Sequence, residues 1–179
     1  ACQNCGSCIE VCPQKAILSE ETHKEEKERG FGILVYAQIS KGLPISSFYE
    51  LLHKAKELSL LTKEPISVFC AGERIDLDAF TGYGIKDLYL AQGEDYRYFI
   101  NRIYLDALCD CIERMRPSIV LFTASEEQRS IAPAAAVHFH TGLTADCVFL
   151  DIDENGLLVQ ERPAFGGNIV ATIVNPDHR

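Results

Sequence analysis

Half of the cysteines of this chain are concentrated at one end of it. Of eight cysteines in 179 residues, four fall within the first twelve: Cys2, Cys5, Cys8 and Cys12. Disulfide bridges join segments that are distant along the chain, whereas four thiols within twelve residues converge on one point. This distribution indicates a metal or cluster site and argues against a disulfide framework.

The spacing of these cysteines selects the kind of site. They follow the pattern C-x2-C-x2-C-x3-C-P, which bacterial ferredoxins use to hold a [4Fe-4S] cluster. Gly6, between the second and third cysteines, permits the positive-φ turn that wrapping a loop around the cluster needs. Zinc sites of four cysteines usually separate two C-x2-C pairs by a dozen or more residues, so structural zinc is the weaker alternative. We therefore expect Cys2, Cys5, Cys8 and Cys12 to ligate cluster iron.

The fourth cysteine leaves one assignment open. In two-cluster ferredoxins the fourth cysteine of each run ligates the other cluster. Cys12 therefore either completes the cluster of Cys2, Cys5 and Cys8 or serves a neighbouring one. Because the chain starts at Ala1 without a methionine, we expect residues 1–19 to be a truncated ferredoxin-like segment whose other half lies upstream.

A charged linker follows this segment. Between Glu20 and Arg29, eight of ten residues are charged, with both signs present, and Gly30 follows. Such runs are usually solvated and carry no chemistry. We expect residues 20–30 to connect the cysteine-rich segment to a separate domain over residues 31–179.

That domain alternates between buried strands and helices. Expected strands cover residues 33–39, 66–70, 87–91, 118–123, 148–153, 157–160 and 169–174, and expected helices cover 46–59 (behind a Ser cap), 75–79, 96–116 and 130–140. Asn155-Gly156 marks a hairpin between two of the later strands. The alternation predicts an α/β, doubly wound, mostly parallel sheet with helices on both faces and a C-terminal antiparallel β-hairpin.

Composition excludes several functions. The 17 basic and 26 acidic residues give a net charge of −9, a field that repels phosphate backbones, so we expect neither nucleic acid nor an anionic membrane as a partner. No apolar stretch approaches the roughly 18 residues of a spanning helix, and nothing resembles a signal peptide. We expect a cytoplasmic protein.

Two motifs of the α/β region resemble the N-terminal domain of electron-transfer flavoprotein α subunits. The first is Arg129-Ser130-Ile131-Ala132-Pro133-Ala134-Ala135-Ala136 with its continuation Thr141-Gly142-Leu143-Thr144-Ala145-Asp146-Cys147, and the second is Arg162-Pro163-Ala164-Phe165-Gly166-Gly167-Asn168-Ile169 with Ala171-Thr172-Ile173. A weaker match is Tyr83-Gly84 with Leu88-Tyr89-Leu90. The chain departs from the family at Gln128 and Ser130, where Gly and Asp are usual, and at Phe139-His140.

The resemblance implies a function in electron transport. It implies a domain that packs against the electron-transfer flavoprotein β subunit and supports FAD held mainly by a C-terminal domain absent from this chain. A ferredoxin-like extension resembles those of flavin-based bifurcating complexes such as caffeyl-CoA reductase and lactate dehydrogenase. In these the extension relays electrons between ferredoxin and flavin, which adds ferredoxin and an acyl-CoA or lactate-type dehydrogenase as partners.

The residues alone leave two rival functions open. Arg129 follows an expected strand end, where α/β sheets bind ligands, so a reductase subunit that binds an adenine nucleotide there is the alternative. A zinc knuckle attached to an interaction domain is the other. The pairs His138/His140 and Asp151/Asp153 are expected to be structural or solvated, and Cys70, Cys109, Cys111 and Cys147 are expected to be buried, inert thiols. No catalytic constellation stands out. Gly166-Gly167 is expected to serve backbone geometry or a subunit contact.

Overall fold

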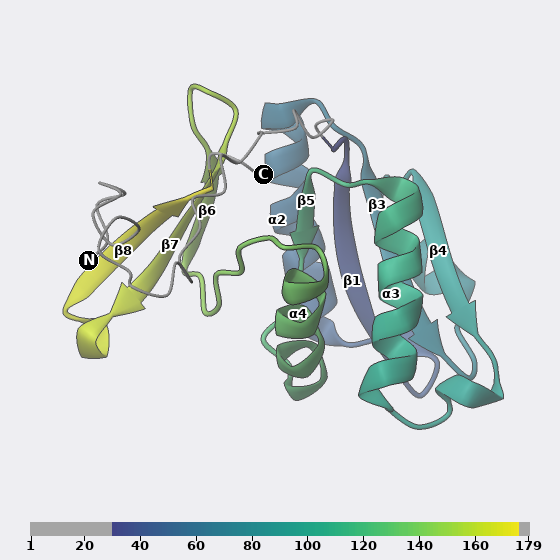
Figure 1. The fold of residues 1–179 in the computed structure, drawn as a ribbon. Coiled ribbons are helices and arrows are strands. Elements are labelled where there is room, and N and C mark those ends of the chain that lie inside the picture. The colour runs from purple at the N-terminus through teal and green to yellow at the C-terminus, as the bar shows by residue number, and fades with distance from the viewer. Residues whose placement is uncertain (1–29, 176–179) are drawn as a thin grey trace, which may run out of the picture.

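The larger of two sheets is parallel and follows the expected alternation of strands and helices. The computed structural model describes residues 30–175, and Figure 1 shows the arrangement of its elements. The strands of this sheet are β1 (Ile33–Ser40), β3 (Ile66–Gly72), β4 (Asp87–Gln92) and β5 (Ile119–Leu121), and the two-residue β2 (Leu43–Pro44) pairs antiparallel with the end of β1. Their order is β4-β3-β1-β5, with Ile33 of β1 opposite both Ile66 and Ile119. From β1 the chain adds β3 and then β4 on one side, and β5 afterwards pairs with the other side of β1.

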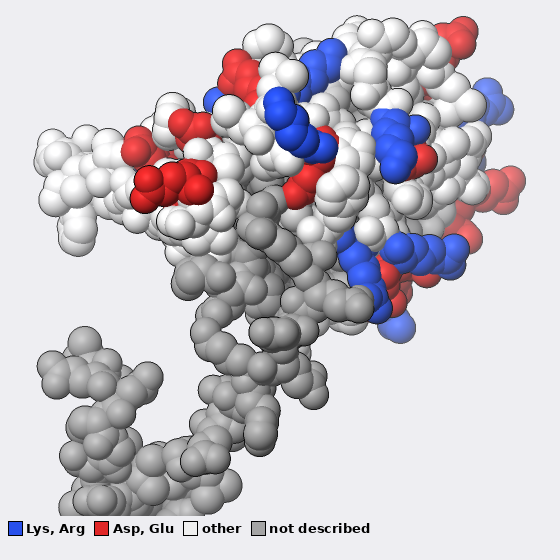
Figure 2. Space-filling view, turned by 90° about the horizontal axis from the view of Figure 1, so that it is seen from above, with Lys and Arg blue, Asp and Glu red and all other residues white. Residues whose placement is uncertain are grey.

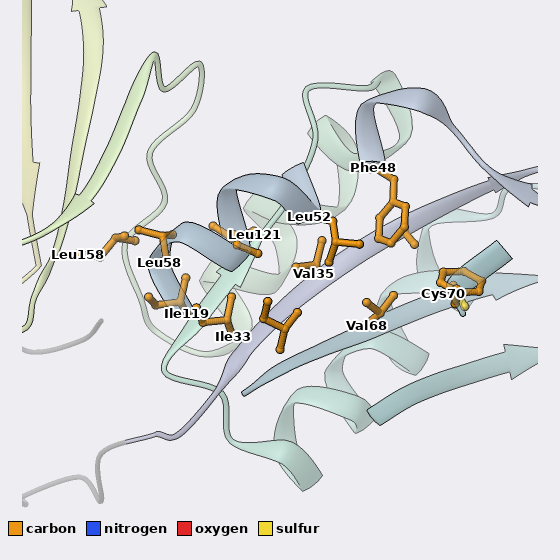
Figure 3. Packing of buried hydrophobic residues seen from close by; sticks show 14 residues of the cluster. Ile33, Val35, Phe48, Leu52, Leu58, Val68, Cys70, Ile119, Leu121 and Leu158 are labelled. Atoms are coloured by element: carbon orange, nitrogen blue, oxygen red, sulfur yellow. The ribbon is translucent and has the colours of Figure 1, made fainter. Parts of the chain in front are cut away.

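Helices cover both faces of the parallel sheet, as predicted. They are α2 (Ser46–Thr62), α3 (Asn101–Met115) and α4 (Glu126–His138), with short 3-10 turns at Leu77–Phe80 and Glu94–Tyr96. Alternate residues of β1 point to opposite faces. Ile33, Val35 and Ala37 pack with α2, whereas Leu34 and Tyr36 pack with α3 and α4. Both layers of the core are thus built on the buried residues 33–37 of β1, and Figure 3 shows the layer under α2.

The smaller sheet is antiparallel and contains the expected hairpin together with a third strand. It consists of β6 (Phe149–Ile152), β7 (Leu158–Ala164) and β8 (Ile169–Val174), with a 3-10 turn at Phe165–Gly167 between the last two. Leu158 buries its side chain in the α2 layer of the main core, close to Leu58 (Figure 3). Lys54 of α2 also lies over the ring of Phe149. The small sheet is therefore fastened to the parallel-sheet domain along α2 (Figure 1).

Two helix boundaries differ from the sequence-based expectation. The helix expected from residue 96 begins at Asn101, because the ring of Tyr96 packs edge-on against Tyr104 and its carbonyl accepts the Tyr104 hydroxyl at 2.9 Å. Phe99 and Ile100, which fall inside the expected helix, precede the observed one and are exposed. The helix expected from residue 130 begins four residues earlier, at Glu126.

Helix caps account for further differences. Ser125 accepts a hydrogen bond from the backbone N–H of Gln128 at 3.3 Å, which is an N-cap that fixes the earlier start of α4. The expected Ser cap of the first helix is wrong: Ile45 is the N-cap of α2, and it makes no side-chain cap bond. Ser46 is the first helical residue, so its side chain stands one position too late to cap.

Candidate functional site

The four expected cluster ligands, Cys2, Cys5, Cys8 and Cys12, lie outside the described residues, so their fit is judged from the chemistry of the donor set. Thiolate sulfur is the usual ligand of iron-sulfur clusters, and four thiolates are the number that one [4Fe-4S] cluster takes. Within residues 30–175, no group of three or more His, Cys, Asp or Glu side chains could hold a metal ion. The donor set fits a cluster, and the described domain offers no competing site.

Of the other four cysteines, three are buried, as predicted. Cys70, Cys109 and Cys111 are buried and Cys147 is half-buried, all as free thiols. Burial raises the pKa of the Cys70 and Cys111 thiols to about 12, so both stay protonated at neutral pH. Cysteines in this state pack as small apolar side chains and do not act as nucleophiles or metal ligands.

The place where this sheet would bind a ligand is filled by the protein itself. Open α/β sheets bind ligands outside the carboxyl ends of their strands, where the strand order reverses, which here is between β1 and β5. Strand pairing there ends at Val35 and Leu121, and the fully buried side chain of Gln128 continues it. Its Oε1 accepts the backbone N–H of Thr123 at 2.5 Å, and its Nε2 donates to the carbonyl of Tyr36 at 3.2 Å. The side-chain amide thus takes the place of a strand residue between β1 and β5.

The start of α4 is electrostatically unsuited to phosphate. Glu126 and Glu127 occupy its first turn, where the helix dipole would otherwise attract an anion. The hydroxyl of buried Tyr36 donates to Glu127 Oε1 at 3.0 Å. Burial raises the pKa of the Glu127 carboxyl, and burial is also the main reason that the pKa of Tyr36 is raised. This pair is an internal contact between β1 and α4.

Arg129, the residue expected to receive a nucleotide in the alternative function, is committed to protein groups. Its Nε donates to the carbonyl of Ala124 at 2.9 Å, and its Nη2 donates to Asp146 Oδ1 at 2.5 Å. Both charged side chains are about half exposed. The ion pair ties the start of α4 to the loop that leads into the small sheet. This geometry argues against Arg129 as a phosphate ligand.

Helix α4, which is rich in alanine, packs on the parallel sheet with one face and leaves its other face exposed. Ala132 and Ala135 are buried against the α3 and α4 side of the core, next to Ile131. Pro133 and Val137, four residues apart, are exposed on the opposite side. The small alanine side chains thus let α4 pack closely within the domain, and its outer face stays open among the described residues.

The small sheet carries several exposed apolar side chains, among them the most exposed of the large apolar residues described, Phe165. Phe165 is 82% exposed at the tip between β7 and β8, where Gly166 and Gly167 adopt φ values of 73° and 91° that favour glycine. No atom lies within 4 Å of a Cβ added at either glycine, so backbone geometry and not close approach requires them. Ile169 and Val170 are also more than half exposed. Such a concentration of exposed apolar groups marks an interaction surface.

The remaining candidates do not converge on a site. His138 Nε2 lies 3.4 Å from Glu113 Oε1 in an exposed pair, and His140 lies beyond the end of α4 with φ of 51°. The carboxylate of Asp153 accepts backbone N–H groups of the β6–β7 turn, and these hydrogen bonds lower its pKa. Both observations agree with the structural or solvated roles expected from the sequence.

The sequence matches two known protein families. Residues 33–179 match the family model of the electron transfer flavoprotein domain, and residues 1–18 match that of the 4Fe-4S binding domain. The chain belongs to the electron transfer flavoprotein family. The suspected resemblance is therefore confirmed, together with the expected α/β fold.

Curated members of the electron transfer flavoprotein family are similar over much or all of the chain. The lactate dehydrogenase (NAD(+),ferredoxin) subunit LctC of Acetobacterium woodii is 36% identical over the whole chain, which spans 44% of that relative. The electron transfer flavoprotein subunit alpha of Thermoanaerobacterium thermosaccharolyticum is 33% identical over 82% of the chain and 45% of the relative. The acryloyl-CoA reductase electron transfer subunit beta of Anaerotignum propionicum is 27% identical, with 82% and 47% covered. The chain thus spans less than half the length of these relatives.

The structure explains the two halves of the first electron transfer flavoprotein motif. Arg129 opens one half and Asp146 is the next-to-last residue of the other, and their ion pair holds the halves together. Gln128, where the chain departs from the usual family residue, is the side chain that bridges β1 and β5. Sequence reasoning missed this role, although Ser125 followed three residues later by Gln128 is a helix-start signal that could have drawn attention to it.

The described part of this electron transfer flavoprotein domain contains no helix that is both long and apolar enough to cross a membrane.

Proposed function

We propose that this chain is the N-terminal portion of an electron transfer flavoprotein α-type subunit that relays single electrons between a [4Fe-4S] cluster and a flavin. The observation that carries the proposal is the joining of two matches in one chain, a 4Fe-4S binding domain over residues 1–18 and an electron transfer flavoprotein domain over residues 33–179. LctC, similar over the whole chain, is by its name a subunit of a lactate dehydrogenase that uses NAD(+) and ferredoxin. A cytoplasmic location is part of the proposal.

In this proposal the cysteine-rich segment holds the cluster. Cys2, Cys5 and Cys8 share one cluster, and Cys12 completes it or serves a neighbour. A bound cluster supplies one-electron oxidation and reduction. Gly6 would permit the turn that such a loop needs, and hydrogen bonds to the cluster sulfurs would tune its reduction potential.

The described domain serves as a dock in this proposal. Gln128 fills the ligand crevice and Glu126 and Glu127 repel phosphate, which supports a FAD site in a further domain of the complete protein. The exposed apolar groups of the small sheet, including Phe165 and Val170, fit a protein partner. We assign this surface to the electron transfer flavoprotein β subunit, with ferredoxin and a lactate-type or acyl-CoA dehydrogenase as the further partners.

Iron and sulfide analysis of the anaerobically purified chain tests the cluster. We expect about four iron and four acid-labile sulfide per chain, a loss of both in Cys8→Ser, and no loss in Cys147→Ser, a matched substitution of a cysteine outside the run. One zinc per chain without sulfide would overturn the electron-carrier proposal in favour of a zinc knuckle. Cys12→Ser separates the two assignments of the fourth cysteine, because full iron content in that variant excludes it from the cluster of Cys2.

Binding to a β subunit tests the dock. Val170→Asp places a charge on the exposed strand surface and should weaken the complex with an electron transfer flavoprotein β subunit, measured by calorimetry on the complete α subunit. Leu77→Asp, at a residue 49% exposed on the parallel-sheet domain, is the matched control. Equal affinities of the two variants would reject the small sheet as the docking surface.

A further inference from the structure

The end of the parallel sheet at which its strands begin carries apolar and basic side chains that no described residue covers. This end, the amino edge, lies at the top of Figure 1, where β1, β3 and β5 start. Phe31 precedes β1 and is 61% exposed, and Leu60 and Leu61 end α2 and are 70% and 56% exposed. Lys63 and Lys86 are exposed beside the starts of β3 and β4. We call Phe31, Leu60, Leu61, Lys63 and Lys86 the amino-edge patch.

Backbone contacts place Phe31, Lys63 and Lys86 beside the starts of the neighbouring strands β1, β3 and β4, and Leu60 and Leu61 precede Lys63 at the end of α2. The N–H of Lys86 donates to the carbonyl of Ile66 at 2.8 Å, which sets it next to the start of β3. The N–H of Gly32, directly after Phe31, donates to Oε2 of the buried Glu64 at 2.9 Å, and the Ser118 hydroxyl donates to the same oxygen. Glu64 follows Lys63, so one buried carboxylate joins the starts of β1, β3 and β5 under the patch.

The N-terminal segment joins the domain beside Phe31, at the β1 side of the patch. A Cβ added at Gly30 would lie 2.4 Å from the carbonyl oxygen of Pro117, so the backbone of Gly30 is pressed against the chain after α3. The N–H of Phe31 donates to the carbonyl of Arg116 at 2.9 Å. These contacts fix where residues 1–29 leave the domain. A tethered segment has an effective concentration in the millimolar range for nearby surfaces, so even a small patch can hold it.

The charge of the N-terminal residues is opposite to that of the lysines in the patch. Residues 20–29 contain five glutamates against three basic residues, and four thiolates make a ligated cluster net negative. Lys63 and Lys86 have no ion pair with any residue from 30 to 175, so their charges are available to an acidic neighbour. Figure 2 looks onto this end and shows lysine and arginine side chains interspersed with acidic ones on the parallel-sheet domain, and further acidic side chains on the small sheet at the left.

We propose that the amino-edge patch is the docking site of the chain's own iron-sulfur segment, residues 1–19. The inference rests on the proposed cluster function and adds to it where the cluster sits. The apolar residues of the segment, such as Ile9 and Val11, contact Phe31, Leu60 and Leu61, and Lys63 and Lys86 face the acidic linker and cluster. The cluster is then held at the end of the domain opposite to the filled ligand crevice.

Cross-linking of the cluster-loaded full chain tests the dock. Lys15 lies in the segment, so a short amine-reactive cross-linker followed by mass spectrometry should join Lys15 to Lys86 far more often than to Lys41, which lies in the β1–β2 turn at the other end of the sheet. The variant Leu61→Glu with Lys63→Glu should reduce the Lys15–Lys86 link about tenfold, because the dock loses an apolar contact and a charge.

A matched variant controls for general effects of two new charges. Leu43→Glu with Lys41→Glu replaces a leucine 50% exposed and a lysine that, like Lys63, has positive φ. It should leave the Lys15–Lys86 link unchanged. Equal yields of the Lys15–Lys86 and Lys15–Lys41 links in the wild-type chain would overturn the docking proposal. A Lys15–Lys86 link whose yield rises with protein concentration would also overturn it, because a bimolecular link assigns the patch to a second copy of the chain. Iron content measured on the same samples separates these results from a failure of the cluster itself.

Discussion

The bridging role of Gln128 predicts a large loss of stability when its side-chain amide is removed. Gln128→Leu keeps a similar volume but removes the acceptor for Thr123 N–H and the donor for the Tyr36 carbonyl. Both backbone groups then lie in the core without their partner, and each unpaired buried group costs about 1–3 kcal/mol. Leucine regains part of this by packing, since the site is fully buried. We expect a net loss of about 2–4 kcal/mol.

Chemical unfolding of the cluster-free chain under reducing conditions measures this loss. The chain has no tryptophan, so far-UV circular dichroism is the suitable signal, with urea as denaturant. For a domain of this size, a loss of 3 kcal/mol corresponds to a decrease of about 6–12 °C in the melting temperature. Gln92→Leu, at an exposed glutamine of β4 with no side-chain hydrogen bond, is the control and should change stability by less than about 0.5 kcal/mol.

The outcome that refutes the reasoning is a small effect. A loss below about 1 kcal/mol for Gln128→Leu would mean that the strands β1 and β5 close on each other without the side-chain amide. The space at their carboxyl ends would then be available to a ligand, and the argument against a nucleotide at this edge would fall with it.

Three further predictions concern titration, reactivity and chain entry. Burial raises the pKa of Glu127, so the folded state holds this proton more tightly than the unfolded state, and the free energy of unfolding should fall as the pH rises above the ordinary glutamate pKa. Glu127→Gln, which can still accept the hydrogen bond from Tyr36, should flatten this decline in urea titrations at several pH values. Iodoacetamide should label half-buried Cys147 at least about tenfold faster than Cys70 in the native chain, and equal rates in peptide mass spectra would contradict the burial of Cys70. Gly30→Val should lower the melting temperature by forcing the backbone away from residues 116–117, and an unchanged value would show that the chain enters the domain elsewhere.

Features that depend on nearby residues could be predicted from the sequence. The strand Ile33–Ser40 and the helix after it follow from periodicity alone, because a run of apolar residues and a repeat of 3.6 are local properties. The inertness of Cys70 and Cys111 followed from their position in apolar surroundings. The boundaries failed where a contact across the fold intervened, as when Tyr96 packs on Tyr104 and delays the start of α3.

The candidate site was less accessible to sequence reasoning. Arg129 was found from its motif, but its partner Asp146 lies 17 residues away, and only the structure pairs them. Gln128 was noticed only as a departure from the family. Its contact with Tyr36 spans 92 residues, a separation over which no local pattern carries information.

By itself, the sequence determined the chemistry at the N-terminus and the class of the domain. Four cysteines within twelve residues specify a cluster-binding segment, since ligand type and spacing are written along the chain, and alternating strands and helices specify an α/β sheet. Only the tertiary structure decided that the ligand crevice is filled, that Arg129 is paired, and that the linker leaves the domain beside an apolar and basic patch. These properties arise from residues brought together by folding, and their energies come from burial and geometry that the linear order of residues does not contain.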